Sequence, residues 1–363
     1  MRSRTRNFIV LLAVALVVAA ISLAVYLRKR AAPEPARLLP SSDAVLYFNL
    51  KSVRRLTSFG NQPFGQHEPE YEEFVRETGF QFERDLNEAA FAVHTVPRPP
   101  AYKGGPATSE SRYSEVFVGK FDGQRLSKYL RKLSNGVERY RETDIFSIPV
   151  EDRIVRVAVL DVDSVAASNL DDASVIRGII DRTRSAAMPF AGPPLVSDFY
   201  HKVPIGSLVW GIAKIPEAPT DPRVARPFTL PGGIDIMVPA ESTMVASIRY
   251  LGSIHARAEF HTPSEIDAKK LADQASGFLT LFKSIEINAQ TANDPDLKSA
   301  LESLKIEQQD SRAILSATIP AGFFKKILEE PPVDVTGAKQ DQPAPAQKDQ
   351  PATRPATPTQ KKK

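Results

Sequence analysis

The chain of 363 residues contains no cysteine and a single tryptophan, Trp210. Without cysteine there are no disulfides, no thiol catalysis and no thiolate metal ligands. The sequence also lacks the Gly-x-Ser-x-Gly motif of serine hydrolases and a glycine-rich loop that ends in Gly-Lys-Ser or Gly-Lys-Thr. Gly119-Lys120 follows a predicted strand without the upstream glycine of a phosphate loop, and Gly252-Ser253 falls in a predicted hairpin turn. We therefore predict neither a nucleophilic serine nor a nucleotide site.

Histidine is scarce and scattered, at positions 67, 94, 201, 255 and 261. A metal site needs several ligands close together. His255 and His261 share one face of a predicted strand, but six residues at about 3.3 Å each place them roughly 20 Å apart. We expect these histidines to be solvated surface residues. The sequence gives no metal site, no cofactor and no catalytic residue that we can name.

Two pairs of aspartates offer the remaining chemistry. Asp161 and Asp163 point the same way at a strand end, which is compatible with a glycosidase-type pair or a cation site. No calcium-loop spacing follows them. Asp171 and Asp172 precede a predicted helix, where Asp172 has a competing role as the cap. We expect both pairs to serve a turn or a helix cap.

One long apolar run is present, from Phe8 to Leu27 (FIVLLAVALVVAAISLAVYL). A run of about 18 or more such residues is typical of a membrane-spanning helix. A cleaved signal usually has a shorter apolar region of about 7–15 residues and a small-residue cleavage site. A buried helix of a soluble core is rarely apolar on all sides at this length. We predict a single-pass anchor with the lipid bilayer as its partner, and the cleaved signal and the core helix remain the alternatives.

The orientation of this anchor depends on nearly balanced flanking charges. Arg2, Arg4 and Arg6 precede the run, whereas Arg28-Lys29-Arg30 and Arg37 follow it. A very short tail in front of a first helix usually stays in the cytoplasm. We therefore favour the inner membrane with the body exported to the periplasmic side, and a cytoplasm-facing body is the alternative.

The formal net charge of +4 is carried by the two ends of the chain. Residues 1–37 hold seven basic side chains and one acidic, and residues 331–363 hold six basic and three acidic. The part between them is mildly acidic, whereas a nucleic-acid-binding domain is usually basic. We expect no nucleic-acid partner, and the basic cluster near the anchor faces anionic lipid head groups.

The sequence divides into segments of different composition. We predict a basic tail at 1–7, the anchor at 8–27, a linker at 28–40 and a disordered tail at 331–363. That tail is rich in Pro, Ala, Gln and Lys and has almost no large apolar side chain to offset its chain entropy. The folded body lies between linker and tail, as two α+β halves at 38–190 and 200–330.

Alternation and helical spacing within the body predict strands and helices in mixed succession. The strand at 44–50 places Leu46 and Phe48 on one face and Val45 and Tyr47 on the other. Asp122 caps a predicted helix, and Gly79 ends another. A proline-rich loop is expected at 216–231, and hairpins are expected around Gly252 and around 310–311. A helix from 262 to 282 begins with Thr262-Pro263-Ser264-Glu265, where Thr262 as cap and Glu265 form a capping box.

We predict the α+β class, with a transmembrane helix followed by a mixed, largely antiparallel sheet body with packed helices. The recurrence of a strand followed by an amphipathic helix suggests two related halves.

Four segments of the body carry a resemblance to known proteins. Ala36-Arg37-Leu38-Leu39-Pro40 runs into AVLYFNL, and TGFQFERDLNEAAFAV, VFVGKFDGQRLSKYL and LKSALESLKIEQQDSRAILSATIPAGFFKKIL follow. Together they resemble a group of single-pass or exported bacterial proteins of unknown function that are common in acidobacteria. The resemblance spans most of residues 37–330 and implies an envelope location. It implies no activity and no catalytic residue.

These observations favour a non-enzymatic, membrane-anchored envelope protein whose body binds another protein or a small ligand. One alternative is an exported hydrolase that uses Asp161 and Asp163. A second alternative is a scaffold that faces the cytoplasm.

Overall fold

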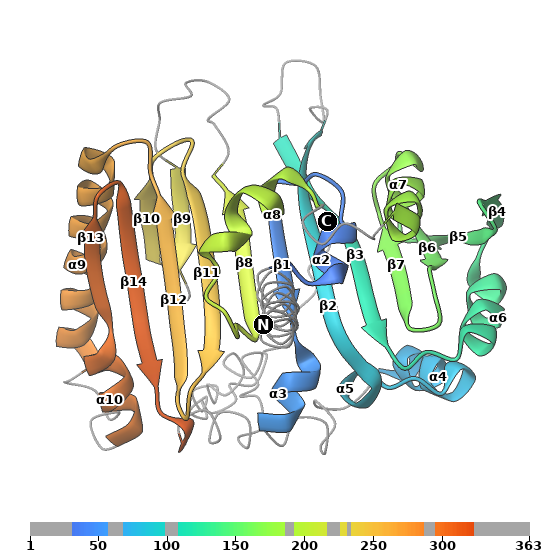
Figure 1. Cartoon of the computed structure of the whole chain (residues 1–363), viewed down its shortest axis with the longest axis horizontal. Coiled ribbons are helices and arrows are strands. Elements are labelled where there is room, and N and C mark those ends of the chain that lie inside the picture. Colours follow the sequence, from blue (N-terminus) through green and yellow to red (C-terminus); the bar gives the residue numbers. More distant parts are fainter. Residues whose placement is uncertain are drawn as a thin grey trace, which may run out of the picture. The chain divides into compact units, whose positions relative to one another are not determined.

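The structure, a computed structural model, describes residues 31–56, 68–98, 108–185, 192–215, 226–230, 234–286 and 295–322 (Figure 1). The predicted anchor at 8–27 and the predicted tail at 331–363 lie outside these residues.

The described strands form one sheet of twelve and a separate two-stranded ribbon. The sheet runs in the order β13-β14-β12-β11-β8-β1-β2-β3-β7-β6-β5-β4, and the ribbon pairs β9 with β10. The strands in the first part of the chain are β1 (Ala44–Phe48), β2 (Leu86–Arg98), β3 (Thr108–Gly119), β4 (Gly136–Tyr140), β5 (Thr143–Val150), β6 (Arg153–Val159) and β7 (Ser164–Ser168). Those in the second part are β8 (Val209–Lys214), β9 (Arg226–Leu230), β10 (Ile234–Val238), β11 (Thr243–Tyr250), β12 (Ile254–His261), β13 (Lys305–Gln309) and β14 (Arg312–Ile319).

Helices connect and cover these strands. They are α2 (Glu34–Leu38), α3 (Leu50–Leu56), α4 (Pro69–Thr78), α5 (Phe82–Asp85), α6 (Gly123–Leu133), α7 (Ser174–Ser185), α8 (Pro194–Phe199), the 3-10 turn η1 (Tyr200–Lys202), α9 (Glu265–Glu286) and α10 (Pro295–Ser303).

Several element ends follow from local chemistry that the sequence shows. The Asp122 carboxylate accepts hydrogen bonds from the N–H groups of Gln124 and Arg125 and caps α6, as predicted. Gly79 ends α4 in the left-handed conformation with φ of 75°, which only glycine adopts without strain. The predicted hairpins around Gly252 (β11–β12) and around residues 310–311 (β13–β14) are also confirmed.

One face of the sheet, the helix-covered face, carries α2, α7 and α8. Val45 and Tyr47 of β1 point to this face, and their neighbours in the same core come from several strands and from these helices. The helix residues of this core are Ala36, Leu38, Ile176, Ile179, Ile180, Leu195 and Val196. Figure 1 shows α2 and α8 crossing in front of the central strands. This face therefore holds the largest buried core of the described residues.

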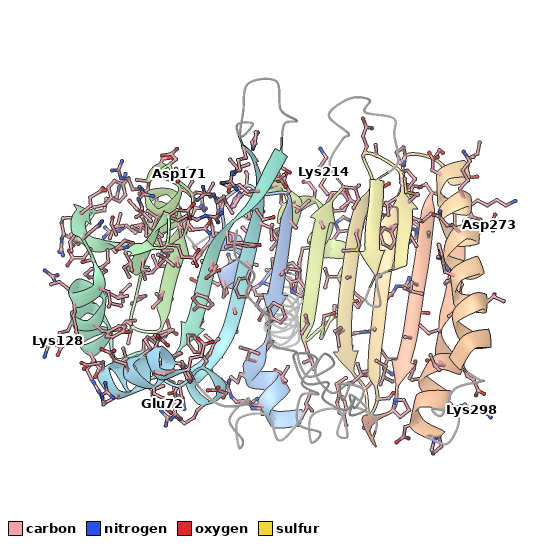
Figure 2. All side chains as sticks on the ribbon, turned by 180° about the vertical axis from the view of Figure 1, so that it is seen from behind. Glu72, Lys128, Asp171, Lys214, Asp273 and Lys298 are labelled. Carbon is pink, nitrogen blue, oxygen red and sulfur yellow. The ribbon has the colours of Figure 1, made fainter. Side chains whose placement is uncertain are left out.

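The opposite face is covered toward its two ends, and Leu50 of α3 and Phe80 also pack near Phe91 of β2 and Phe117 of β3. At one end, Leu126 and Leu130 of α6 pack on Phe146 and Val165. At the other end, Leu271 of α9 packs with Phe260, Ala313 and residues of β10. In Figure 2, Glu72 and Lys128 mark α4 and α6 at one end, and Asp273 and Lys298 mark α9 and α10 at the other. The central strands lie between these two covered regions.

The structure corrects the predicted fold class. Every strand pairing among the described residues is antiparallel, so the sheet is not mixed. The strands of the two predicted halves lie in one continuous sheet, because β1 pairs with β8 across the expected boundary. That the two halves are related stays a prediction. No helix in the described ranges combines the length and apolarity needed to cross a membrane. A sheet-dominated body with packed helices still agrees with the α+β class.

One local prediction was also wrong. The segment 216–231, predicted as a proline-rich loop, contains β9 with Pro227 inside it. A two-stranded ribbon has a free side for each strand, and proline is tolerated on such edges.

Candidate functional site

A single row of side chains crosses all twelve strands on the face opposite to α2, α7 and α8. The pairing register aligns one residue of each strand. From β4 to β13 the row reads Val137, Phe146, Val157, Ala167, Glu115, Phe91, Leu46, Gly211, Ala246, Ala258, Leu315 and Ile306. Glu115 is the only polar residue in this row. An apolar row of this length is what a buried sheet face requires.

The middle of this face is nevertheless accessible. Leu46 is 39% exposed, Ile248 is 38% exposed and Tyr113 is 40% exposed. These residues belong to β1, β11 and β3, which lie between the two covered ends. We define the central apolar face as the outward residues of β3, β2, β1, β8 and β11, namely Tyr113, Glu115, Phe91, Val93, Leu46, Gly211, Ala246 and Ile248. Tyr113, Leu46 and Ile248 lie two strands apart in the sheet order. Phe91 and Val93 of β2 lie between Tyr113 and Leu46, and Gly211 and Val209 of β8 lie between Leu46 and Ile248. Accessible apolar residues gathered on one face are a candidate interaction site.

Part of the central apolar face carries small residues, so its surface there lies closer to the backbone. Gly211 and Ala246 are direct neighbours on β8 and β11. A Cβ atom at Gly211 would lie 2.8 Å from the Cδ2 atom of Leu46, so the Leu46 side chain leans over the glycine. Leu46 can move away because only the far end of a flexible side chain is involved. The face therefore has small residues on β8 and β11 beside larger ones, Leu46 and Phe91, on β1 and β2.

Glu115 is the one carboxylate on the central apolar face. Its direct neighbours across the strands are Phe91 on β2 and Ala167 on β7. No described residue forms a hydrogen bond or an ion pair with its carboxylate. Burial raises the pKa of the Glu115 carboxyl. A partly buried carboxylate that no described residue pairs, on an apolar face, is a candidate ligand contact.

A second polar cluster lies on the helix-covered face, around Glu259 of β12. Its carboxylate is 2.7 Å from Nε of Arg257, 3.5 Å from Nη1 of Arg312 and 3.8 Å from Nε2 of His261. Burial, and next the positive charge of Lys202, lower the pKa of His261 to about 4, and Glu259 opposes this shift. The Nε2 atom of His261 is buried and has no hydrogen-bond partner among the described residues. Two arginines neutralise Glu259, so this cluster reads as a structural ion network.

The aspartates considered from the sequence lie in turns and at a cap. Asp161 and Asp163 are exposed between β6 and β7, where the Asp161 carboxylate accepts the N–H of Val162 at 2.7 Å. Asp172 accepts the N–H of Ser174 at 2.8 Å at the start of α7, and the hydrogen bonds from Ser174 lower its pKa. Asp171 lies 3.6 Å from Arg112. The predicted cap at Asp172 is therefore confirmed, and the hydrolase site gains no supporting contact.

The histidines are separated in the structure, and His67 lies outside the described residues. His94 is within 3.2 Å of the Ser114 hydroxyl on β3. His255 contacts Ser253 and Thr318, whereas His201 is exposed on η1. In the part of the chain that the structure describes, no group of three His, Asp or Glu side chains could hold a metal ion.

Sequence reasoning missed Glu115 as a site residue. The signal was present in the alternation Tyr113, Glu115, Phe117, where a charged residue interrupts the apolar face of a strand. Its meaning depends on which residues of β2 and β7 stand beside it, and the pairing of β3 with β7 joins segments about fifty residues apart.

Comparisons with known proteins leave the chain without a family. No protein-family model matches it, and no curated protein matches it. Among solved structures it is similar to crystal form III of TP0453, with a TM-score of 0.42, 11% identity and coverage of 82% of this chain and 98% of that chain. Crystal form IV gives a TM-score of 0.40 at 11% identity, with 82% of this chain and 96% of that chain covered. These similarities assign neither a family nor a function, and the resemblance to acidobacterial envelope proteins stays a prediction.

Proposed function

We propose that this protein is a non-enzymatic binding module whose central apolar face binds the apolar chain of a small amphiphile. The supporting observation is that Leu46, Ile248 and Tyr113 are between 38% and 40% exposed on a sheet face that is apolar apart from Glu115. Leaving apolar area in water costs about 25 cal/mol per Å². A ligand that covers this area recovers that free energy.

The size of the face favours a small ligand over a protein surface. Its five strands are adjacent, so they span about 19 Å at about 4.8 Å per strand. Outward residues at three alternate positions of a strand span roughly 13 Å, which gives an area of about 250 Å². A stable protein interface buries about 800 Å² on each partner. An apolar chain with one polar end matches the smaller area.

We further propose that the body works at a lipid bilayer, attached through residues 8–27, in the inner membrane with the body on the periplasmic side. The apolar run and the basic residues around it support this location. Full-length protein is expected in the membrane fraction after ultracentrifugation of a detergent-free lysate, and protease added to spheroplasts is expected to cut the body. An intact chain in the supernatant contradicts the attachment, and an uncut body in spheroplasts contradicts the orientation.

A charge placed on the central apolar face tests the binding site. The full-length protein in lipid discs is expected to bind an aliphatic fluorescent dye above the background of empty discs. Ile248→Lys is expected to weaken dye binding by about tenfold, because the ammonium group must stay hydrated where the chain would pack. Fluorescence titration measures the affinity.

A matched variant separates this effect from a general loss of exposed apolar surface. Val162 is 82% exposed in the turn between β6 and β7, away from the central apolar face. Val162→Lys is expected to bind the dye as the unchanged protein does. Equal binding by Ile248→Lys and Val162→Lys would remove the central apolar face as the site.

A further inference from the structure

We propose, resting on the proposed function, that Glu115 selects amphiphiles that carry a cationic nitrogen, such as a primary amine, at the end of an apolar chain. The juxtaposition that carries this inference is a single carboxylate among eleven uncharged residues that the twelve-stranded sheet places in one row.

The carboxylate of Glu115 has no cation inside the described part of the protein. Arg112 is near in sequence, but it points to the other face of β3, because it pairs with His94 whereas Glu115 pairs with Phe91. Arg112 is also engaged, at 2.6 Å from Glu110 and 2.9 Å from the carbonyl oxygen of Asn169. Glu115 is thus left as the acceptor for a group that comes from outside the described residues.

Burial makes the charged form of Glu115 unfavourable. Desolvation is the cause that raises the pKa of this carboxyl. A cation that binds beside it restores the lost electrostatic stabilisation, and a hydrogen bond between charged partners is roughly twice as strong as a neutral one. A carboxylate head group would be repelled, and a neutral alcohol would gain only an ordinary hydrogen bond.

The position of Glu115 also gives the ligand a direction. Glu115 is on β3, at one side of the central apolar face, and Phe91, Leu46, Gly211 and Ala246 follow it strand by strand. An amine at Glu115 therefore leaves about 19 Å of apolar row for the chain. On the other side of Glu115 the row continues into Phe146, which α6 covers. The ligand is expected to extend from β3 toward β11.

Binding of three probes with the same chain length tests the selection. Dodecylamine, dodecanol and dodecanoate are titrated below their micelle concentrations into full-length protein in lipid discs, with empty discs as background. At neutral pH the amine is cationic, since alkyl ammonium groups titrate near 10. We expect dodecylamine to bind about tenfold more tightly than dodecanol, and dodecanoate to bind most weakly.

Two variants with the same change of charge assign the preference to one residue. Glu115→Gln keeps the shape of the side chain and is expected to bind amine and alcohol equally. Glu307→Gln removes a carboxylate from the exposed edge strand β13 and is expected to keep the preference. Unchanged thermal unfolding of both variants shows that each is folded.

The outcomes separate this inference from the proposed function. Equal binding of amine and alcohol by the unchanged protein overturns the role of Glu115 and leaves the apolar site standing. If Glu115→Gln still binds dodecylamine more tightly than dodecanol, the role of Glu115 is overturned as well. If none of the three probes binds, the apolar site itself is wrong. If a lysine-bearing apolar peptide binds and dodecylamine does not, the ligand is a protein segment and not a small amphiphile, and the inference is overturned.

Discussion

At the scale of single residues, two groups whose pKa values are shifted by burial, Glu115 and His261, lie on opposite faces of the sheet. Glu115 has no hydrogen-bond or ion-pair partner among the described residues and lies among apolar neighbours, whereas His261 is part of the ion network around Glu259 beneath α8 and η1. The difference in surroundings gives them different roles. A carboxylate that no described residue pairs can still gain a ligand, whereas burial and the charge of Lys202 lower the pKa of His261 and keep its imidazole neutral at pH 7.

His261 makes stability depend on pH in a defined direction. Its pKa of about 4 in the folded protein is below the value of 6.5 for a free imidazole. The folded state therefore binds fewer protons than the unfolded state between these values. The contribution of His261 to the free energy of unfolding is fully present above about pH 6.5, and it is lost as the pH falls toward about 4.

We expect the free energy of unfolding to fall by about 2 kcal/mol over this range on account of His261, a value reduced because the side chain is not fully buried. His261→Gln is expected to remove this part of the pH dependence. Urea unfolding of both proteins at pH 7 and pH 4.5 gives the comparison. His255→Gln is the control, since His255 lies on the same strand but contacts Ser253 and Thr318 instead of the network around Glu259. If the free energy of unfolding falls equally between pH 7 and pH 4.5 in the unchanged protein and in His261→Gln, His261 is not the source of this pH dependence.

At the scale of elements, the start of α9 shows what the sequence could and could not specify. The predicted capping box was wrong by two residues. The Ser264 hydroxyl donates to the Asp267 carboxylate at 2.7 Å and accepts the Asp267 N–H at 3.2 Å. Thr262 instead stays with the sheet, where its N–H bonds to the carbonyl of Ser311 at 2.9 Å. A hydroxyl residue followed three positions later by an acid occurs twice in this segment, as Thr262 with Glu265 and as Ser264 with Asp267. The sequence alone therefore allowed either Thr262 or Ser264 as the cap.

The strands show a similar limit. The alternation in β1, with Val45 and Tyr47 on one face and Leu46 and Phe48 on the other, was predicted correctly. Both faces are apolar, however, so the alternation could not indicate which one receives α2 and α8. That choice follows from the helix-covered core, in which Tyr47 stacks on Trp210 with ring centroids 5.4 Å apart. The candidate site lies on the face that is left, and the sequence held no sign of it beyond Glu115 itself.

At the scale of the whole molecule, long-range pairing set the architecture that sequence reasoning missed. The hairpins β11–β12 and β13–β14 join neighbouring segments and were predicted. The pairing of β1 with β8 joins residues more than 150 positions apart, and it turns two expected halves into one sheet. The Lys214 N–H bonds to the carbonyl of Asp43 at 2.8 Å, and the Asn49 N–H bonds to that of Leu208 at 2.7 Å, so the ladder continues past both ends of β1.

This continuity predicts that residues on both sides of the β1–β8 pairing unfold together. Ile179 of α7 is fully buried in the helix-covered core, and Leu271 of α9 is 2% exposed in the core at the far end of the sheet. Ile179→Ala and Leu271→Ala each remove a buried aliphatic group and are each expected to cost about 2–5 kcal/mol. Both should lower the temperature of one and the same transition in scanning calorimetry, with calorimetric and van't Hoff enthalpies that agree. Two independent halves would instead give two transitions, one moved by Ile179→Ala and the other by Leu271→Ala.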